Sequence, residues 1–172
     1  MEKSNLPKSL TTLEAYAFYG CLRMEYFTLS STNLVSVPSD GYTFYNMGSS
    51  LSSDKELTVF ISKEVKKIPD YLFKAVNSSY PARIKHLVFE EDNECVEIGQ
   101  YAFYYVTTLK ELTLPETITT IGNYAFYYCS ALPEIILSES LLSIGAYAFT
   151  YCTSASHIIF NEKLTTIGNY AF

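Results

Sequence analysis

The stretch Thr119–Cys129, TTIGNYAFYYC, is written several times along this chain. Ile144–Cys152 reads IGAYAFTYC, Ile167–Phe172 reads IGNYAF, and Ile98–Phe103 reads IGQYAF. The isoleucines that open these copies are 23 residues apart each time. Self-similarity at a fixed period is typical of proteins in which each unit stacks on its neighbours. The sequence therefore predicts a repeat solenoid.

The first half of each unit has the pattern of a short strand. Leu112 and Leu114 flank Thr113, so the two leucines should point inward and the threonine outward. Pro115 follows and cannot donate to a strand ladder, so we expect the strand to end there. Because the units stack in order, these strands should pair in parallel.

The second half of each unit has the pattern of a turn. Gly122 should allow a tight corner, since glycine can adopt positive φ. The segment NYAFYYC that follows predicts one short helical or 3₁₀ turn capped by Asn123. The expected unit is thus one short parallel β-strand and one short helical or 3₁₀ turn per 23 residues.

About seven copies of the motif fill residues 1–172, which we interpret as a single solenoid domain. Residues 84–172 are regular, whereas residues 22–83 carry insertions in polar patches that are typical of loops. Neither end shows a polar capping unit. Two expectations follow: the chain is a fragment of a longer array, or it self-associates through uncapped ends. The motif phenylalanines are Phe18, Phe44, Phe73, Phe103, Phe126, Phe149 and Phe172.

The run L-x-x-L-x-L-P-x-x-I-x-x-I-G-x-Y-A-F-x-x-C resembles the BspA-type leucine-rich repeat of surface proteins from anaerobic bacteria and some parasitic protists. Its period lies within the leucine-rich-repeat range. The resemblance implies a leucine-rich-repeat α/β horseshoe-like coil, exposure at the cell surface, and contact with host extracellular-matrix proteins or other cells. The chain departs from the motif where Val106, Val76 and Met47 replace the cysteine.

Composition excludes several classes of protein. Hydrophobic residues make up 48% and charged residues 17%, which argues against disorder. The net charge of −6 argues against a nucleic-acid partner. No run of apolar residues is long enough to predict a membrane-spanning segment. The N-terminal residues lack the apolar core of a signal peptide, so we expect either an intracellular protein or a chain that has lost its leader.

Catalytic and metal-binding patterns are also missing from the sequence. It contains no G-x-G-x-x-G, P-loop, H-E-x-x-H or G-x-S-x-G motif. Its two histidines, His86 and His157, should lie three coils apart, about 14–15 Å, which is too far for one metal ion. We therefore predict a non-enzymatic protein without cofactor or metal.

The outward strand positions predict a binding face. Stacked coils should align them into a partly apolar column with polar flanks, and solenoids use such extended faces for binding. The alternative is β-propensity alone, because Val, Ile and Thr suit any strand. The candidate protein-binding residues are His86, Val88, Glu111, Thr113, Glu134, Ile136, His157 and Ile159.

Tyrosines form a second candidate surface. One tyrosine precedes every motif phenylalanine by two positions, and we expect its ring to pack between coils. The tyrosines after the phenylalanine predict an exposed aromatic rim, with packing of the convex side as the alternative. The candidate rim residues are Tyr104, Tyr105, Tyr127, Tyr128 and Tyr151.

Two smaller features of the sequence are a pair of cysteines and a glycosylation sequon. Cys129 and Cys152 should point inward at equivalent places on adjacent coils, about 4.7–5 Å apart, where free thiols or a disulfide are both feasible. Asn77-Ser78-Ser79 is a glycosylation sequon, which matters only in a secretory pathway.

Together these patterns predict a non-enzymatic protein–protein interaction module. The family resemblance implies a cell-surface, adhesin-like domain that binds host or matrix proteins through its sheet face. The alternative is an intracellular scaffold that uses the same face, which the missing signal peptide favours. A third hypothesis is weak carbohydrate binding at the tyrosine rim.

Overall fold

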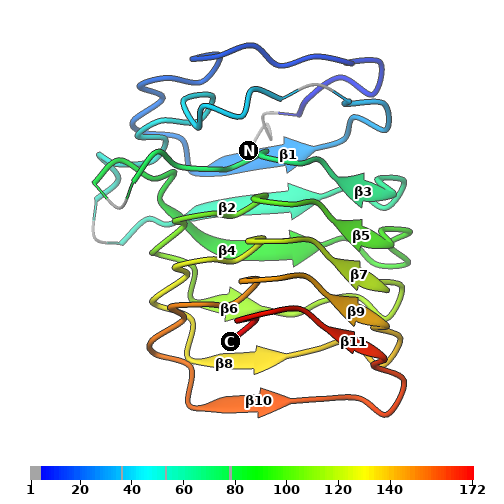
Figure 1. The fold of residues 1–172 in the computed structure, drawn as a ribbon. Coiled ribbons are helices and arrows are strands. Elements are labelled where there is room, and N and C mark those ends of the chain that lie inside the picture. The colour runs from blue at the N-terminus through cyan, green and yellow to red at the C-terminus, as the bar shows by residue number, and fades with distance from the viewer. Residues whose placement is uncertain (1–4, 36, 53, 78) are drawn as a thin grey trace.

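A computed structural model of the chain describes residues 5–35, 37–52, 54–77 and 79–172. The chain winds into a stack of coils with the N-terminal coils at one end and the C-terminal coils at the other (Figure 1). All the strand pairings are parallel and join successive coils. The predicted solenoid is therefore present as a parallel β-solenoid.

The first sheet contains the strands that the leucine pattern predicts. A four-stranded part and a two-stranded part are joined by a single bridge between Thr113 and Ile136. In spatial order the strands are β1 (Tyr26–Leu29), β2 (Leu57–Ile61), β4 (Ile84–Phe89), β6 (Glu111–Leu112), β8 (Glu134–Ile136) and β10 (His157–Ile159).

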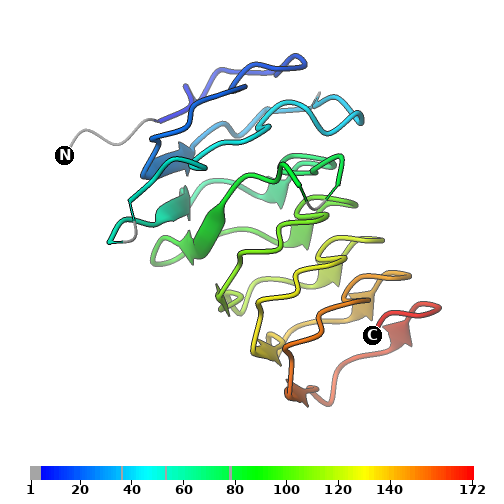
Figure 2. The ribbon, with the colours of Figure 1, turned by 90° about the vertical axis from the view of Figure 1, so that its left-hand side faces the viewer.

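A second sheet, which the sequence pattern did not predict, runs along a different flank of the coils (Figures 1 and 2). Each of its strands is only two residues long and ends at the isoleucine of the unit. The strands are β3 (Lys67–Ile68), β5 (Glu97–Ile98), β7 (Thr120–Ile121), β9 (Ser143–Ile144) and β11 (Thr166–Ile167). The regular unit thus has two strands, where we expected one.

The segment after the glycine is not a helix, and the described part of the chain contains no α- or 3₁₀-helix. In this segment Tyr124 and Phe126 donate their backbone N–H groups to Ala146 and Ala148 of the next coil, at 2.9 and 2.8 Å. The residue after each donor bonds within its own coil, as Tyr127 does to Tyr124 at 3.3 Å. The predicted helical turn is therefore replaced by a run of turns that forms a third ladder between coils.

This run of turns places tyrosine in the left-handed backbone region. Tyr124 has a φ of 56°, and the equivalent Tyr101, Tyr147 and Tyr170 have φ of 55–58°. This conformation costs a residue with a Cβ about 1–2 kcal/mol. We expected positive φ at Gly122 instead, and that expectation was wrong, since Gly122 does not have it.

The unit needs glycine at this position because neighbouring coils approach closely there, and not because of its φ angle. A Cβ built on Gly145 would lie 2.5 Å from the backbone nitrogen of Asn123 and 2.6 Å from the carbonyl carbon of Gly122. The same contact recurs at Gly122 and Gly168. Each coil therefore rests its glycine directly on the backbone of the coil before it.

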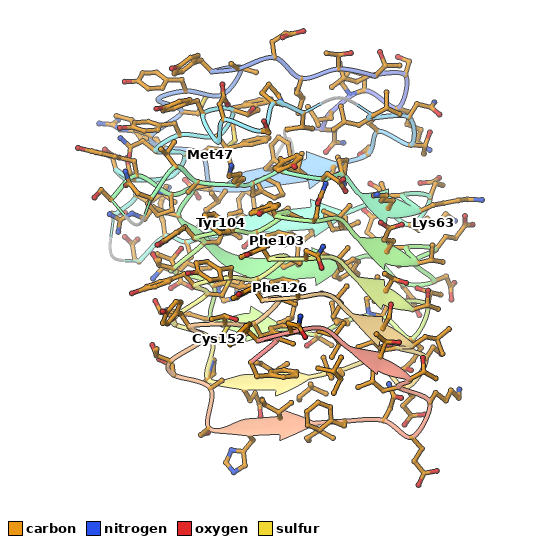
Figure 3. The ribbon with its side chains drawn as sticks, in the orientation of Figure 1. Met47, Lys63, Phe103, Tyr104, Phe126 and Cys152 are labelled. Carbon is orange, nitrogen blue, oxygen red and sulfur yellow. The ribbon has the colours of Figure 1, made fainter. Side chains whose placement is uncertain are left out.

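The interior is a single apolar cluster that runs from Leu6 to Ala171. Phenylalanine rings stack along it: Phe103 lies 5.1 Å from Phe126 at an interplanar angle of 1° (Figure 3). The tyrosines before them form a parallel stack, with Tyr101 and Tyr124 at 4.7 Å. Such aromatic pairs contribute about 0.5–1.5 kcal/mol each beyond their burial, which offsets the strained tyrosine backbone.

The coil that contains β10 and β11 packs against the coil that contains β8 and β9. Several of its apolar side chains are exposed, as at Phe160 (50%), Ile167 (51%) and Phe172 (43%). The strands β10 and β11 each pair with a single partner.

The cysteines are free thiols, and three of the four are buried. Cys129 and Cys152 point inward, and their sulfur atoms lie 3.5 and 3.4 Å from the carbonyl oxygens of Phe103 and Phe126. Burial raises the pKa of Cys95 to about 11 and of Cys152 to about 12, and it raises the pKa of Cys129 well above the ordinary value. Cys21 is half-buried.

Replacing Gly145 by alanine should destabilise the protein strongly. The added Cβ would overlap the backbone of the preceding coil, and overpacking of this kind costs about 3 kcal/mol. Gly20→Ala is the control, because Gly20 has a φ of 71° but nothing within 4 Å of its added Cβ, so only the backbone term of about 1 kcal/mol applies. Urea unfolding measures both. Equal losses would show that close approach is not what the glycine provides.

The buried thiols should be unreactive in the folded protein. With Ellman's reagent at pH 8, Cys21 should react quickly and the other three cysteines only after unfolding, because buried neutral thiols are poor nucleophiles. Their folded pKa values lie above the ordinary 9.0, so the unfolded state loses protons first as the pH rises. The free energy of unfolding should accordingly fall above pH 9. Rapid reaction of all four thiols at pH 8 would contradict the packing.

Candidate protein-binding face

The first sheet aligns the outward side chains of six coils into two columns, which we call the sheet face. Register pairs Phe60 with Val88, Thr113 with Ile136, and Ile136 with Ile159. The neighbouring column pairs His86 with Glu111 and Glu134 with His157. All eight candidate residues from the sequence therefore lie on one surface.

The apolar column of the sheet face is exposed. Val88, Ile136 and Ile159 are 39%, 42% and 58% exposed, and Thr113 is also exposed. The inward neighbours of Thr113 and Ile136 are buried, as at Ile135 (1%), whereas Ile158 beside Ile159 is half-buried. The alternation follows from the pleat, which turns successive side chains to opposite faces. The exposed apolar side chains form one line across neighbouring coils.

The polar column contains a network of polar contacts in its N-terminal half. The carboxylate of Glu56 accepts hydrogen bonds from Lys110 Nζ and from His86 Nε2, both at 2.6 Å. These bonds lower the pKa of Glu56 to about 2. His86 Nδ1 also lies 3.4 Å from Glu111 Oε2. His86 is therefore held between two carboxylates, and its side chain is only 25% exposed.

The C-terminal half of the polar column is more open. His157 is exposed and lies beside Glu134 in register, but its Nδ1 contacts Ser156 Oγ at 2.8 Å instead. Within the described ranges, no group of three or more His, Cys, Asp or Glu side chains converges as a metal ligand set.

Several residues of the sheet face were missed in the sequence analysis. Tyr26 and Phe60 extend it toward the N-terminus, with ring centroids 6.3 Å apart, and Glu56 joins its polar column. They belong to the irregular coils, where insertions hide the period. The alternation in LTVFIS, Leu57–Ser62, was the signal that could have identified Phe60.

The candidate tyrosine rim is a set of stacked rings. Tyr104 lies 4.9 Å from Tyr127, and Tyr105 lies 4.8 Å from Tyr128, at interplanar angles of 8° and 18°. Burial, followed by the neighbouring phenols, raises the pKa of Tyr104 to about 12. Tyr151, near the C-terminal end of the rim, is 52% exposed. Tyr151 meets Tyr128 at 43° and Tyr127 edge-on at 85°. Because the rings of Tyr104 and Tyr127, and those of Tyr105 and Tyr128, cover each other's faces, the geometry there favours packing over stacking on a sugar.

Two further predictions concern glycosylation and membrane insertion. The sequon Asn77-Ser78-Ser79 includes Ser78, which is outside the described residues. Among the residues that the structure describes, no helix is long and apolar enough to cross a membrane.

Comparisons with known structures agree with this architecture. A leucine-rich cell surface protein from Faecalibacterium prausnitzii A2-165 is similar over 99% of this chain and 44% of its own, with 17% identity and a TM-score of 0.58. A leucine-rich repeat protein from T. pallidum is similar over 95% of this chain and 72% of its own, with 16% identity and a TM-score of 0.54. At these identities the likeness is one of fold.

This chain spans less than half the length of the F. prausnitzii protein. A comparison with curated proteins gave no significant match. The family comparison is decisive, because the matched residues, 1–86 and 79–172, cover the chain in six repeat copies. The chain belongs to the BspA type leucine-rich repeat family.

Proposed function

We propose that this chain is a non-enzymatic protein-interaction module that binds a protein partner across its sheet face. The observation that carries the proposal is the exposed apolar column of Val88, Thr113, Ile136 and Ile159. Contiguous apolar surface with polar flanks is typical of interaction sites. Membership of a leucine-rich repeat family supports the same role.

The scaffold suits such a role because it holds the face in place before binding. Two strand ladders and the turn ladder join neighbouring coils, so the sheet face loses little conformational freedom on association. The hydrogen bonds of Glu56 with His86 and Lys110 fix the polar column in its N-terminal half. A preorganised face needs fewer contacts for a given affinity.

The more specific proposal is an adhesin-like domain at the cell surface that binds a host or extracellular-matrix protein. Two points support it: the BspA-type repeat and the fold shared with a protein described as a cell surface protein. The alternative is an intracellular scaffold that uses the same sheet face. A leader or a membrane anchor encoded in the complete gene would favour the surface, and its absence there would favour the scaffold.

Charge placed on the apolar column should weaken partner binding. The variant Ile136→Lys/Ile159→Lys puts two ammonium groups where a partner's apolar surface would dock, and we expect affinity to fall at least about tenfold, or 1.4 kcal/mol. Biolayer interferometry against a panel of matrix proteins and host-cell surface proteins measures it. Circular dichroism checks that the exposed substitutions leave the fold intact.

The matched control is Ser143→Lys/Thr166→Lys, which adds the same charge to outward positions of the second sheet. Its affinity should stay within about twofold of the parent. Light scattering of each protein separates partner binding from self-association through the exposed last coil. Equal losses in both variants, or unchanged binding in the Ile136 and Ile159 variant, would move the site away from the sheet face.

A further inference from the structure

A groove of about 560 Å³ opens beside the sheet face, between the loops that follow β4 and β6. It exists because one loop is longer than the next. Leu87 pairs with Leu112 and Ile98 pairs with Ile121, yet the first coil has two more residues between these fixed points. The extra residues lie in the loop Glu90–Glu94 and leave a gap against the shorter loop of the following coil.

The floor of the groove is apolar. It is formed by Val88 at the end of the exposed column, by the buried Leu114, and by the half-buried Pro115. Three residues that line the groove also belong to the sheet face: Val88, Glu111 and Thr113. The groove is therefore a continuation of the face proposed to bind a partner.

The charged side chains that line the groove are all acidic. They come from both loops and from β6, and the residues that line the groove include no lysine, arginine or histidine. The lining carboxylates are Glu90, Glu91, Asp92, Glu111 and Glu116. This concentration exceeds what the chain as a whole would suggest, since its net charge is −6 across 172 residues.

The carboxylates differ in how far the protein already satisfies them. Glu90 accepts the backbone N–H of Lys63 at 3.2 Å, and Glu116 accepts that of Glu139 at 2.9 Å. Glu91 and Asp92 are exposed, and no ion pair joins either of them to another described residue. Their charges are the ones available to a ligand.

The long loop is anchored, so the groove is preformed. The side-chain amide of Asn93, which is 5% exposed, donates to the carbonyl oxygens of Ile61 and Ser62 at 3.1 and 3.2 Å. Its oxygen accepts the N–H of Cys95 at 2.9 Å. From the next coil, Thr117 Oγ1 donates to the carbonyl oxygen of Cys95 at 2.6 Å. The loop therefore needs no ordering when a ligand binds.

We propose that this groove binds a basic segment of the protein partner. The aliphatic stem of an arginine or lysine lies on Val88 and Pro115, and its charged head lies beside Glu91 and Asp92. Long cationic side chains bury their stems on apolar surface while the head stays with water and carboxylates, which is the chemistry that this groove offers. The inference rests on the proposed function, because it assigns a partner chemistry to one edge of the same face.

The test uses a fluorescein-labelled octapeptide of alternating arginine and serine, measured by fluorescence polarisation against the whole chain. The same peptide with citrulline in place of arginine keeps the shape and removes the charge. The groove variant is Glu91→Gln/Asp92→Asn, in which asparagine tolerates the φ of 56° found at Asp92. The control variant is Glu14→Gln/Glu162→Gln, which removes two exposed carboxylates elsewhere.

We expect the arginine peptide to bind the parent chain at least about tenfold more tightly than the citrulline peptide does. We also expect the arginine peptide to bind the groove variant at least about tenfold more weakly than it binds the parent chain. The control variant should stay within about twofold of the parent. If both variants weaken peptide binding equally, net charge explains the binding and the inference is wrong. Equal binding of the two peptides, or no binding of the arginine peptide, would also contradict it. If the arginine peptide does not bind, loss of partner binding in the Ile136→Lys/Ile159→Lys variant would still support the sheet face as the protein-binding site. Peptide binding without any protein partner would support the groove alone.

Discussion

Backbone hydrogen bonds between successive coils set a spacing of about 4.8 Å, and the rest of the structure conforms to it. Ring stacking obeys the same spacing, with Tyr124 and Tyr147 at 4.7 Å and Phe126 and Phe149 at 5.2 Å. Gly145 is needed because no side chain fits between backbones held this close. The tyrosines accept a left-handed backbone because that geometry points their N–H groups at the next coil.

The same spacing turns isolated outward residues into a surface. A single exposed isoleucine is ordinary on any protein, but Ile136 and Ile159 stand in register on adjacent strands. Repetition also concentrates charge, as in the polar column where Glu56 reaches His86 and Lys110 from different coils. A partner would meet these columns as one continuous face, although the residues that compose it lie far apart in the chain.

The sequence was a good guide where the period is strict and a poor one where structure depends on neighbours. The 23-residue repeat predicted the solenoid and the inward leucines such as Leu112, because burial alone selects them. The second sheet was missed because two residues, as at Thr120–Ile121, are too short to show alternation. The helical turn was mispredicted because contact with the next coil, which local propensity does not contain, decides the conformation of NYAFYYC. The groove was missed although the sequence shows the longer loop, because the sequence does not show that the extra residues leave a gap against the next coil.

The glycine column has a consequence for how such a protein can change over evolutionary time. Along the second sheet the backbones touch, so that flank behaves as a spine in which Gly122, Gly145 and Gly168 admit almost no variation. The loops after the first sheet carry no such restriction, and the coil that contains the loop Glu90–Glu94 is two residues longer than the next coil while the pairing on either side is kept. Binding specificity can therefore diversify by small insertions on one flank while the spine preserves the register of the whole array.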